Sequence, residues 1–161
     1  PYLSTAGANF GGSAFVVFGH GGATQATFDL ASLDGGNGFS IQGATPGARV
    51  GMSVARVGDV NGDGFDDLAI SSGHFGERDE RYLLFGGAEF DATLVLDALD
   101  GTRGLALVSE QPGFSDSPID LRGAGDLNGD GFDDLVYEAL PPATSAIAGV
   151  LYGRDFNATA T

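Results

Sequence analysis

The sequence predicts an all-β protein made of four-stranded antiparallel blades of a partial β-propeller, and three observations lead to this prediction. One unit of 67 residues recurs, so that the chain holds about two and a third copies of it. Each copy contains short apolar runs separated by Gly-rich turns, which is typical of strands. No window of about eleven residues keeps helical spacing before a Gly or Pro interrupts it. Four short strands per repeat favour propeller blades over a sandwich.

The 67-residue period is carried by two motifs. Phe18, Phe85 and Tyr152 are each followed by Gly, and successive pairs are 67 residues apart. The Asp-rich segment 58–68 returns at 125–135 with the same step. Two unrelated motifs that share one period indicate a repeated structural unit.

The expected strands follow these motifs along the chain. Apolar runs that end at an aromatic-Gly pair have the pattern of strands buried on both faces. Runs on either side of each Asp-rich segment are expected to be the two arms of a hairpin, and two further apolar runs complete the set. In chain order the expected strands are 15–18, 26–30, 53–57, 68–70, 82–85, 93–96, 121–125, 135–137 and 150–152.

These strands divide the chain into blades. We expect a partial blade at 12–50, a blade at 51–116, an incomplete blade at 117–153 and a tail at 154–161. Open blades leave strand edges and apolar faces that soluble proteins cover, and a propeller closes only with about four to eight blades. We therefore expect the chain to be either a fragment of a larger propeller or a protomer that packs with other chains.

Each Asp-rich segment places oxygen-bearing groups at alternate positions of a tight loop. Asp59, Asn61, Asp63 and Asp67 occupy positions 1, 3, 5 and 9, and the carbonyl of Phe65 supplies position 7. A shell of hard oxygens with three carboxylates suits Ca²⁺ better than Zn²⁺ or Mg²⁺. By the repeat, the second set of ligands is Asp126, Asn128, Asp130, Phe132 and Asp134. Two calcium ions per chain are therefore expected.

A simpler interpretation is that Asn-Gly and Asp-Gly only make turns. Three acids that converge in one loop would oppose folding without a cation, and two near-identical copies favour the metal site. Asp66 and Asp133, at position 8, are expected to point away from the ion. Because the two loops are a full repeat apart, we expect each site to bind independently of the other.

Together these motifs resemble FG-GAP repeats. The resemblance rests on the aromatic-Gly pair, on the loop Gly-Asp-(Val/Leu)-Asn-Gly-Asp-Gly-Phe-Asp-Asp-Leu and on the Gly-Met-Ser-Val-Ala sequence at 51–55. It implies the β-propeller found in integrin α subunits and in many bacterial surface proteins, in which this loop joins the first two strands of a blade and binds Ca²⁺. The second copy departs from the pattern at residues 117–121, where the lead-in sequence is missing.

Composition argues against several other functions. A formal charge of −15 and the lack of any basic cluster exclude nucleic-acid binding. The longest apolar run, residues 14–18, is too short for membrane insertion, and the lack of Cys excludes disulfides and thiolate metal sites. His20 and His74 stand in Gly-rich loops, and neither a nucleophile elbow nor a phosphate-binding loop occurs. No catalytic residue is therefore predicted.

The leading hypothesis is a secreted or cell-surface propeller segment with structural calcium, acting in adhesion or as a protein-interaction scaffold. Extracellular calcium would saturate even sites with a Kd of about 10⁻⁴ M. One alternative is the propeller portion of a secreted hydrolase whose active site lies elsewhere. Another is a glycan-binding module that uses Phe39, Phe75 or Phe114. The partners would be other propeller blades and an extracellular protein or glycan.

Overall fold

The computed structural model of the chain describes residues 12–21, 27–43, 48–73, 80–108, 121–139 and 147–156. In these segments the strands are β1 (Ser13–Val17), β2 (Gly38–Gln42), β3 (Ser53–Gly58), β4 (Asp67–Ser72), β5 (Glu80–Leu84), β6 (Thr93–Val95), β7 (Gly104–Val108), β8 (Leu121–Gly125), β9 (Asp134–Ala139) and β10 (Ile147–Leu151). Two 3-10 turns, η1 (Leu30–Ser32) and η2 (Leu96–Ala98), are the helical elements of the same segments. No helix in the described part is long and apolar enough to cross a membrane. The all-β prediction is confirmed.

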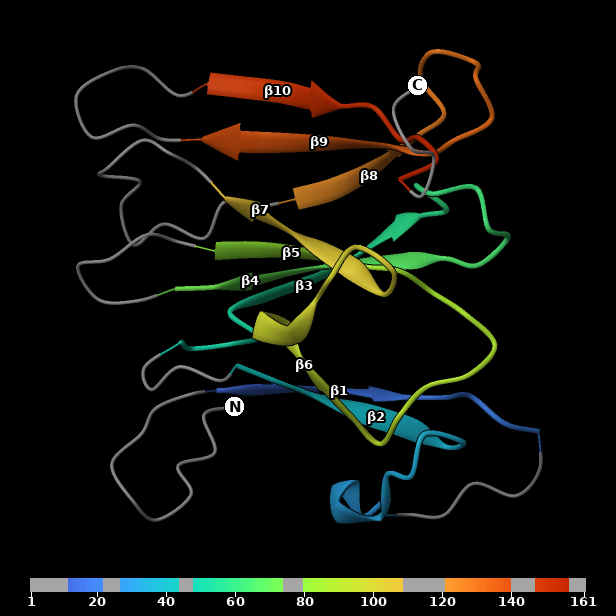
Figure 1. The fold of residues 1–161 in the computed structure, drawn as a ribbon, viewed down its shortest axis with the longest axis vertical. Helices are drawn as coiled ribbons and strands as arrows, with labels where there is room; N and C mark the ends of the chain where they lie inside the picture. The colour runs from blue at the N-terminus through green and yellow to red at the C-terminus, as the bar shows by residue number, and fades with distance from the viewer. Residues whose placement is uncertain are drawn as a thin grey trace.

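Three sheets are stacked along the long axis of the molecule (Figure 1). The first has the order β1-β2-β6, the second β3-β4-β5-β7 and the third β10-β9-β8. Every neighbouring pair in the second and third sheets is antiparallel. The second sheet therefore has the four-stranded antiparallel form expected of a propeller blade.

Both hairpins that carry an Asp-rich loop bend at the same place. The register shifts between Arg56 and Gly58 in β3, and between Gly123 and Gly125 in β8. Gly58 and Gly125 have φ angles of 82° and 70°, in the left-handed region that favours Gly. Such a bulge increases the local twist, so each strand turns into its loop at the same repeat position.

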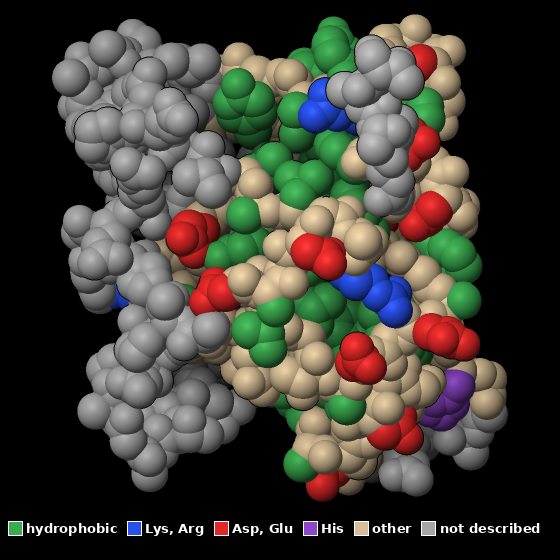
Figure 2. Space-filling view, viewed as in Figure 1, with side chains coloured by type: hydrophobic (Ala, Val, Ile, Leu, Met, Phe, Trp, Pro, Cys, Tyr) green, Lys and Arg blue, Asp and Glu red, His purple; other side chains and the backbone are tan. Residues whose placement is uncertain are grey.

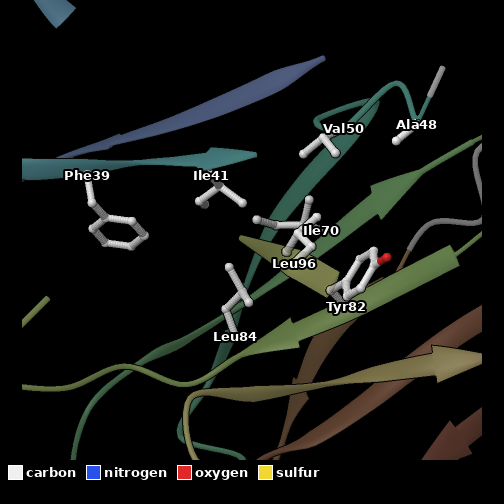
Figure 3. Close-up of a cluster of buried hydrophobic side chains, with 8 residues drawn as sticks. All are labelled: Phe39, Ile41, Ala48, Val50, Ile70, Tyr82, Leu84 and Leu96. Carbon is white, nitrogen blue, oxygen red and sulfur yellow. The ribbon is translucent and has the colours of Figure 1, made fainter. Parts of the chain in front are cut away.

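The inner strands of the second sheet, β4 and β5, are buried on both faces by two separate cores. Between the first and second sheets lies a cluster shown in Figure 3, made of Phe39, Ile41, Ala48, Val50, Ile70, Tyr82, Leu84 and Leu96. Between the second and third sheets lies a cluster of Val57, Val60, Ala69, Leu83, Phe85, Leu121 and Leu135. Because successive side chains of a strand face opposite sides, Tyr82 and Leu84 of β5 enter the first cluster and Leu83 enters the second. The continuous apolar run that predicted a strand buried on both faces is explained by this arrangement.

Two strand predictions need correction. In the expected strand 26–30, the described residues 27–30 contain no strand, and the chain turns into η1 instead. Asp29 explains the turn, because its Oδ1 accepts a bond of 2.9 Å from the amide of Ala31, a local bond that competes with strand pairing.

The run 93–96 does contain the strand β6, but this strand pairs in parallel with β2 of the first sheet. The fourth strand of the second sheet is instead β7, which pairs with β5 and was not expected. Leu94 and Leu96 pack in the first cluster. Burial of these side chains between the two sheets explains why β6 leaves the second sheet and pairs with β2 of the first.

Candidate metal centre

The predicted ligands lie in two loops that join the first two strands of their sheets, except that Asp67 and Asp134 are the first residues of the strands that follow. Residues 59–66 connect β3 to β4, and residues 126–133 connect β8 to β9. Figure 1 draws both loops on the same side of the stack, and Figure 2 shows acidic side chains along that side. Gly62 and Gly64 have φ angles of 76° and 89°, and the corresponding glycines of the second loop have 79° and 93°. This backbone curls each loop around its first Asp.

The first Asp of each loop binds three backbone amides. Oδ1 of Asp59 accepts bonds from the amides of Gly62 at 2.7 Å and Asp63 at 3.0 Å, and Oδ2 accepts from Gly64 at 2.8 Å. Asp126 accepts the three corresponding bonds at 2.7, 3.1 and 2.9 Å. These amides, led by that of Gly131, lower the pKa of Asp126 below its ordinary value. The loop is thus shaped around a charged carboxylate.

The residues at positions 3 and 5 bind each other. Oδ1 of Asn61 accepts from the amide of Asp63 at 3.0 Å, and Nδ2 of Asn61 donates to Oδ2 of Asp63 at 2.9 Å. Oδ1 of Asp63 also accepts from the amide of Phe65 at 2.9 Å. In the second loop the same bonds measure 3.0, 2.8 and 3.0 Å.

The last Asp of each loop is fully buried and ties the loop to the aromatic-Gly pair. Asp67 accepts from the amide of Val60 at 2.9 Å through Oδ2 and from the amide of Gly86 at 2.8 Å through Oδ1. Asp134 accepts the corresponding bonds at 2.9 and 2.9 Å, the second from Gly153. This partner role of the Gly was missed from the sequence, although its shared 67-residue period with the loop was the available signal.

The environment of Asp67 favours an added positive charge. Burial, and to a smaller extent the negative charges of Asp63 and Asp59, raise its pKa to about 6 against the opposing effect of its two amide bonds. The three carboxylates of the loop therefore lie close enough to repel one another. A bound cation would remove this repulsion.

The donor atoms suit a hard cation, but they do not form a complete coordination shell. In the described part of the chain, no group of three or more His, Cys, Asp or Glu side chains is arranged to hold a metal ion. The carboxylates instead accept amides of their own loops. A carboxylate has about four lone-pair sites, so Asp59 with three amide bonds and Asp67 with two keep room for a cation. Binding would draw the ligand side chains closer together.

The two loops touch, contrary to the expectation that a full repeat would separate them. The amide of Asp59 donates to Oδ2 of Asp133 at 2.9 Å, and the amide of Asp133 donates to the carbonyl of Asp59 at 2.9 Å. Asp66, at the same position of the first loop, is exposed and forms an ion pair with Arg56, with bonds of 2.8 and 2.7 Å. The two position-8 acids thus have different roles.

Of the three aromatic residues considered for glycan binding, the structure describes Phe39, which is not exposed. Phe39 is buried in the first cluster, stacked on Phe90 with ring centroids 4.5 Å apart. Phe75 and Phe114 lie outside the described residues. A pocket of about 270 Å³ between the first and second sheets is lined by Phe39, Phe65 and Phe90, among others. Because Phe39 is buried in the core, its ring is not exposed for stacking against a sugar.

Comparison with known proteins agrees with this architecture. Residues 50–86 match the family model described as FG-GAP repeat. The chain is 33% identical over 105 residues to integrin alpha-5 of Xenopus laevis, 31% over 123 residues to integrin alpha-V of Gallus gallus and 29% over 100 residues to integrin alpha-IIb of Mus musculus. The aligned residues cover 62%, 74% and 62% of this chain and 9%, 10% and 9% of those proteins. The chain therefore spans about a tenth of the length of the curated relatives it matches.

Proposed function

This chain belongs to the FG-GAP repeat family of integrin α-like propellers, and from that premise we propose that it is a calcium-binding segment of a secreted or cell-surface protein, acting as a non-enzymatic scaffold for adhesion or protein interaction. In this proposal the calcium ions are structural. One ion belongs to each Asp-rich loop.

The observation that carries the proposal is the agreement between the two loops. Eight hydrogen bonds organise the first loop and its link to Gly86, and the same eight organise the second loop and its link to Gly153. An ordinary hairpin turn needs neither three acids nor this network. The repeated arrangement supports a common ligand.

Calcium suits the donor set better than other cations. Each loop offers three carboxylates, one amide oxygen and backbone carbonyls, and the chain contains no Cys. Ca²⁺ accepts six to eight oxygens in flexible geometry, whereas Mg²⁺ demands a tighter octahedral shell and retains water. The ligands are proposed as Asp59, Asn61, Asp63, Phe65, Asp67, Asp126, Asn128, Asp130, Phe132 and Asp134.

An extracellular location follows from the expected strength of such sites. Extracellular calcium modules bind with a Kd of roughly 10⁻⁴ to 10⁻³ M, and millimolar calcium outside the cell fills sites of this strength. The cytosol would leave them empty. A protein that needs these ions for its shape would therefore work outside the cell.

Other propeller blades are the partners we propose for the open faces of the stack. Val60 and Phe85 are 0% and 3% exposed because the third sheet covers them. Their equivalents in the third sheet, Leu127 and Tyr152, are 57% and 54% exposed. A further blade, from the same longer chain or from another chain, would bury the second pair as the third sheet buries the first. The scaffold would then present its loops to an extracellular protein or glycan.

Calorimetric titration of the chelator-treated chain with Ca²⁺ tests the proposal. We expect about two Ca²⁺ ions per chain, because each of the two loops has one set of ligands, and we expect weaker binding of Mg²⁺. Asp63→Ala and Asp130→Ala should each lower the binding, while Asp66→Ala removes an acid of the same loop that lies outside the ligand set and should leave it unchanged. Lack of any binding at millimolar Ca²⁺ would refute the proposed function.

A further inference from the structure

We propose that the two Asp-rich loops form one coupled unit, in which Asp133 and Phe132 of the second loop hold the first loop in its cation-binding shape. This inference rests on the calcium sites proposed above and adds a dependence between them. Asp133 is a positioning residue, since it acts on the first site through the backbone of that loop.

The contact is made at the residue that organises the first loop. Asp59 and Asp133 exchange two hydrogen bonds, amide to carboxylate and amide to carbonyl, each 2.9 Å long. The carboxylate of the same Asp59 accepts hydrogen bonds from the amides of Gly62, Asp63 and Gly64. Asp133 therefore fixes the backbone from which the first loop is built.

Packing between the loops is close enough to exclude side chains. A Cβ added at Gly58 would overlap the carboxylate of Asp133, and one added at Gly62 would lie 2.5 Å from Cε1 of Phe132. At the equivalent positions of the second loop, Gly125 and Gly129, an added Cβ would have no atom of the described residues within 4 Å. The glycines of the first loop thus make room for the second loop, whereas those of the second loop serve the backbone turn alone.

A second link joins the two buried carboxylates. Asp134 accepts the amide of Gly153 at 2.9 Å, and the next amide, that of Arg154, donates to the carbonyl of Val60 at 2.9 Å. The amide of Val60 in turn donates to Asp67 at 2.9 Å. A short chain of backbone groups therefore connects the last ligand of one loop with the last ligand of the other, and it provides a second route for the coupling that we infer.

The experiment compares matched variants of the chain. Asp133→Ala removes the contact between the loops. Asp66→Ala is the matched control, because Asp66 has the same repeat position but forms the exposed ion pair with Arg56. Gly62→Ala and Gly129→Ala introduce the same methyl group at φ angles of 76° and 79°, so their backbone strain is equal and only Gly62→Ala meets Phe132. Calcium titration followed through the NMR signals of the loop glycines separates the two sites, and amide hydrogen exchange of Asp59 in EDTA reports the contact without metal.

We expect Asp133→Ala to speed exchange of the Asp59 amide and to weaken binding at the first loop by about tenfold or more, the value of a lost bond to a charged acceptor. Asp133→Asn keeps an acceptor oxygen and should retain most of the affinity. Gly62→Ala should weaken the first site more than Gly129→Ala weakens the second, a comparison that holds even if Asp133→Ala does not fold.

Equal effects within each matched pair would overturn the coupling and leave the proposed function intact, provided that the unaltered chain binds two ions. If the unaltered chain binds no calcium, the proposed function fails, and the coupling of cation sites falls with it. The two failures are therefore distinguished by the titration of the unaltered chain alone.

Discussion

The glycine of the aromatic-Gly pair serves different purposes in different repeats. Gly86 donates its amide to buried Asp67, and a Cβ at this position would lie 2.5 Å from the carbonyl oxygen of Asp66 and 2.6 Å from Cβ of Phe65. Gly19 occupies the same repeat position after β1 of the first sheet, yet a Cβ added there would have no atom of the described residues within 4 Å. One dipeptide is therefore a fixed support under an Asp-rich loop in one place and an open turn in the other.

Substitution of these two glycines tests the difference. Gly86→Ala should lower the free energy of unfolding by about 1–3 kcal/mol, because the new methyl group meets backbone that cannot rotate away. Gly19→Ala should change it by less than about 0.5 kcal/mol, as at an ordinary surface site. Urea denaturation in saturating Ca²⁺ measures both values. Equal losses would contradict the assigned role of Gly86.

The two Asp-rich hairpins concentrate negative charge in short loops. Each holds three acids between two strands, and the chain as a whole carries a formal charge of −15. Backbone amides order these acids without neutralising them. The loops therefore fold at an electrostatic cost that a bound cation would offset.

Removal of calcium should destabilise both hairpins. A ligand that binds only the folded state stabilises it by about 2.7 kcal/mol per site at a hundredfold excess over Kd. The Tm of the chain should accordingly be lower in EDTA than in Ca²⁺, and it should rise with calcium concentration. Added Mg²⁺ at the same ionic strength is the control for screening. Superimposable melting curves in Ca²⁺ and EDTA would show that the hairpins do not need the ion.

In the molecule as a whole, the stacking of the sheets gives residues at the same repeat position different degrees of burial. The inner strands of the second sheet are covered on both faces, whereas Leu127, Val150 and Tyr152, in and beside the third sheet, stay exposed at repeat positions that are buried in the second repeat. Repeat units of this kind contact their neighbours in sequence. Burial is thus a property of a residue's place in the stack and not of its place in the repeat.

One pair of substitutions makes this asymmetry measurable. Val60→Asp should lower the free energy of unfolding by about 3 kcal/mol or more, because it places a charge inside the second cluster. Leu127→Asp, at the same loop position, should change the stability by less than about 0.5 kcal/mol and should reduce self-association through the open face. Denaturation and sedimentation velocity follow the two effects. A large loss of stability in Leu127→Asp would mean that this face is already covered.

The sequence by itself determined the repeat, the all-β class and the Asp-rich loops. These features depend on backbone conformations set within a few residues: Gly at left-handed positions, acids at alternate loop positions, and apolar runs such as that of β5. The expected hairpin arms around both loops coincide with β3, β4, β8 and β9 for the same reason. Local chemistry is sufficient where the interacting groups are neighbours in the chain.

Only the tertiary structure decided the strand partners of β6 and β7, the burial of Phe39, and the contact between the two loops. β6 pairs with β2 across 53 residues of chain, and Asp133 meets Asp59 across 74. Asp66 and Asp133 stand in identical local sequence, Gly-Phe-Asp-Asp-Leu, yet one binds a surface Arg and the other the neighbouring loop. Their difference arises from which sheet packs next to each, because a long-range contact depends on stacking that no local pattern encodes.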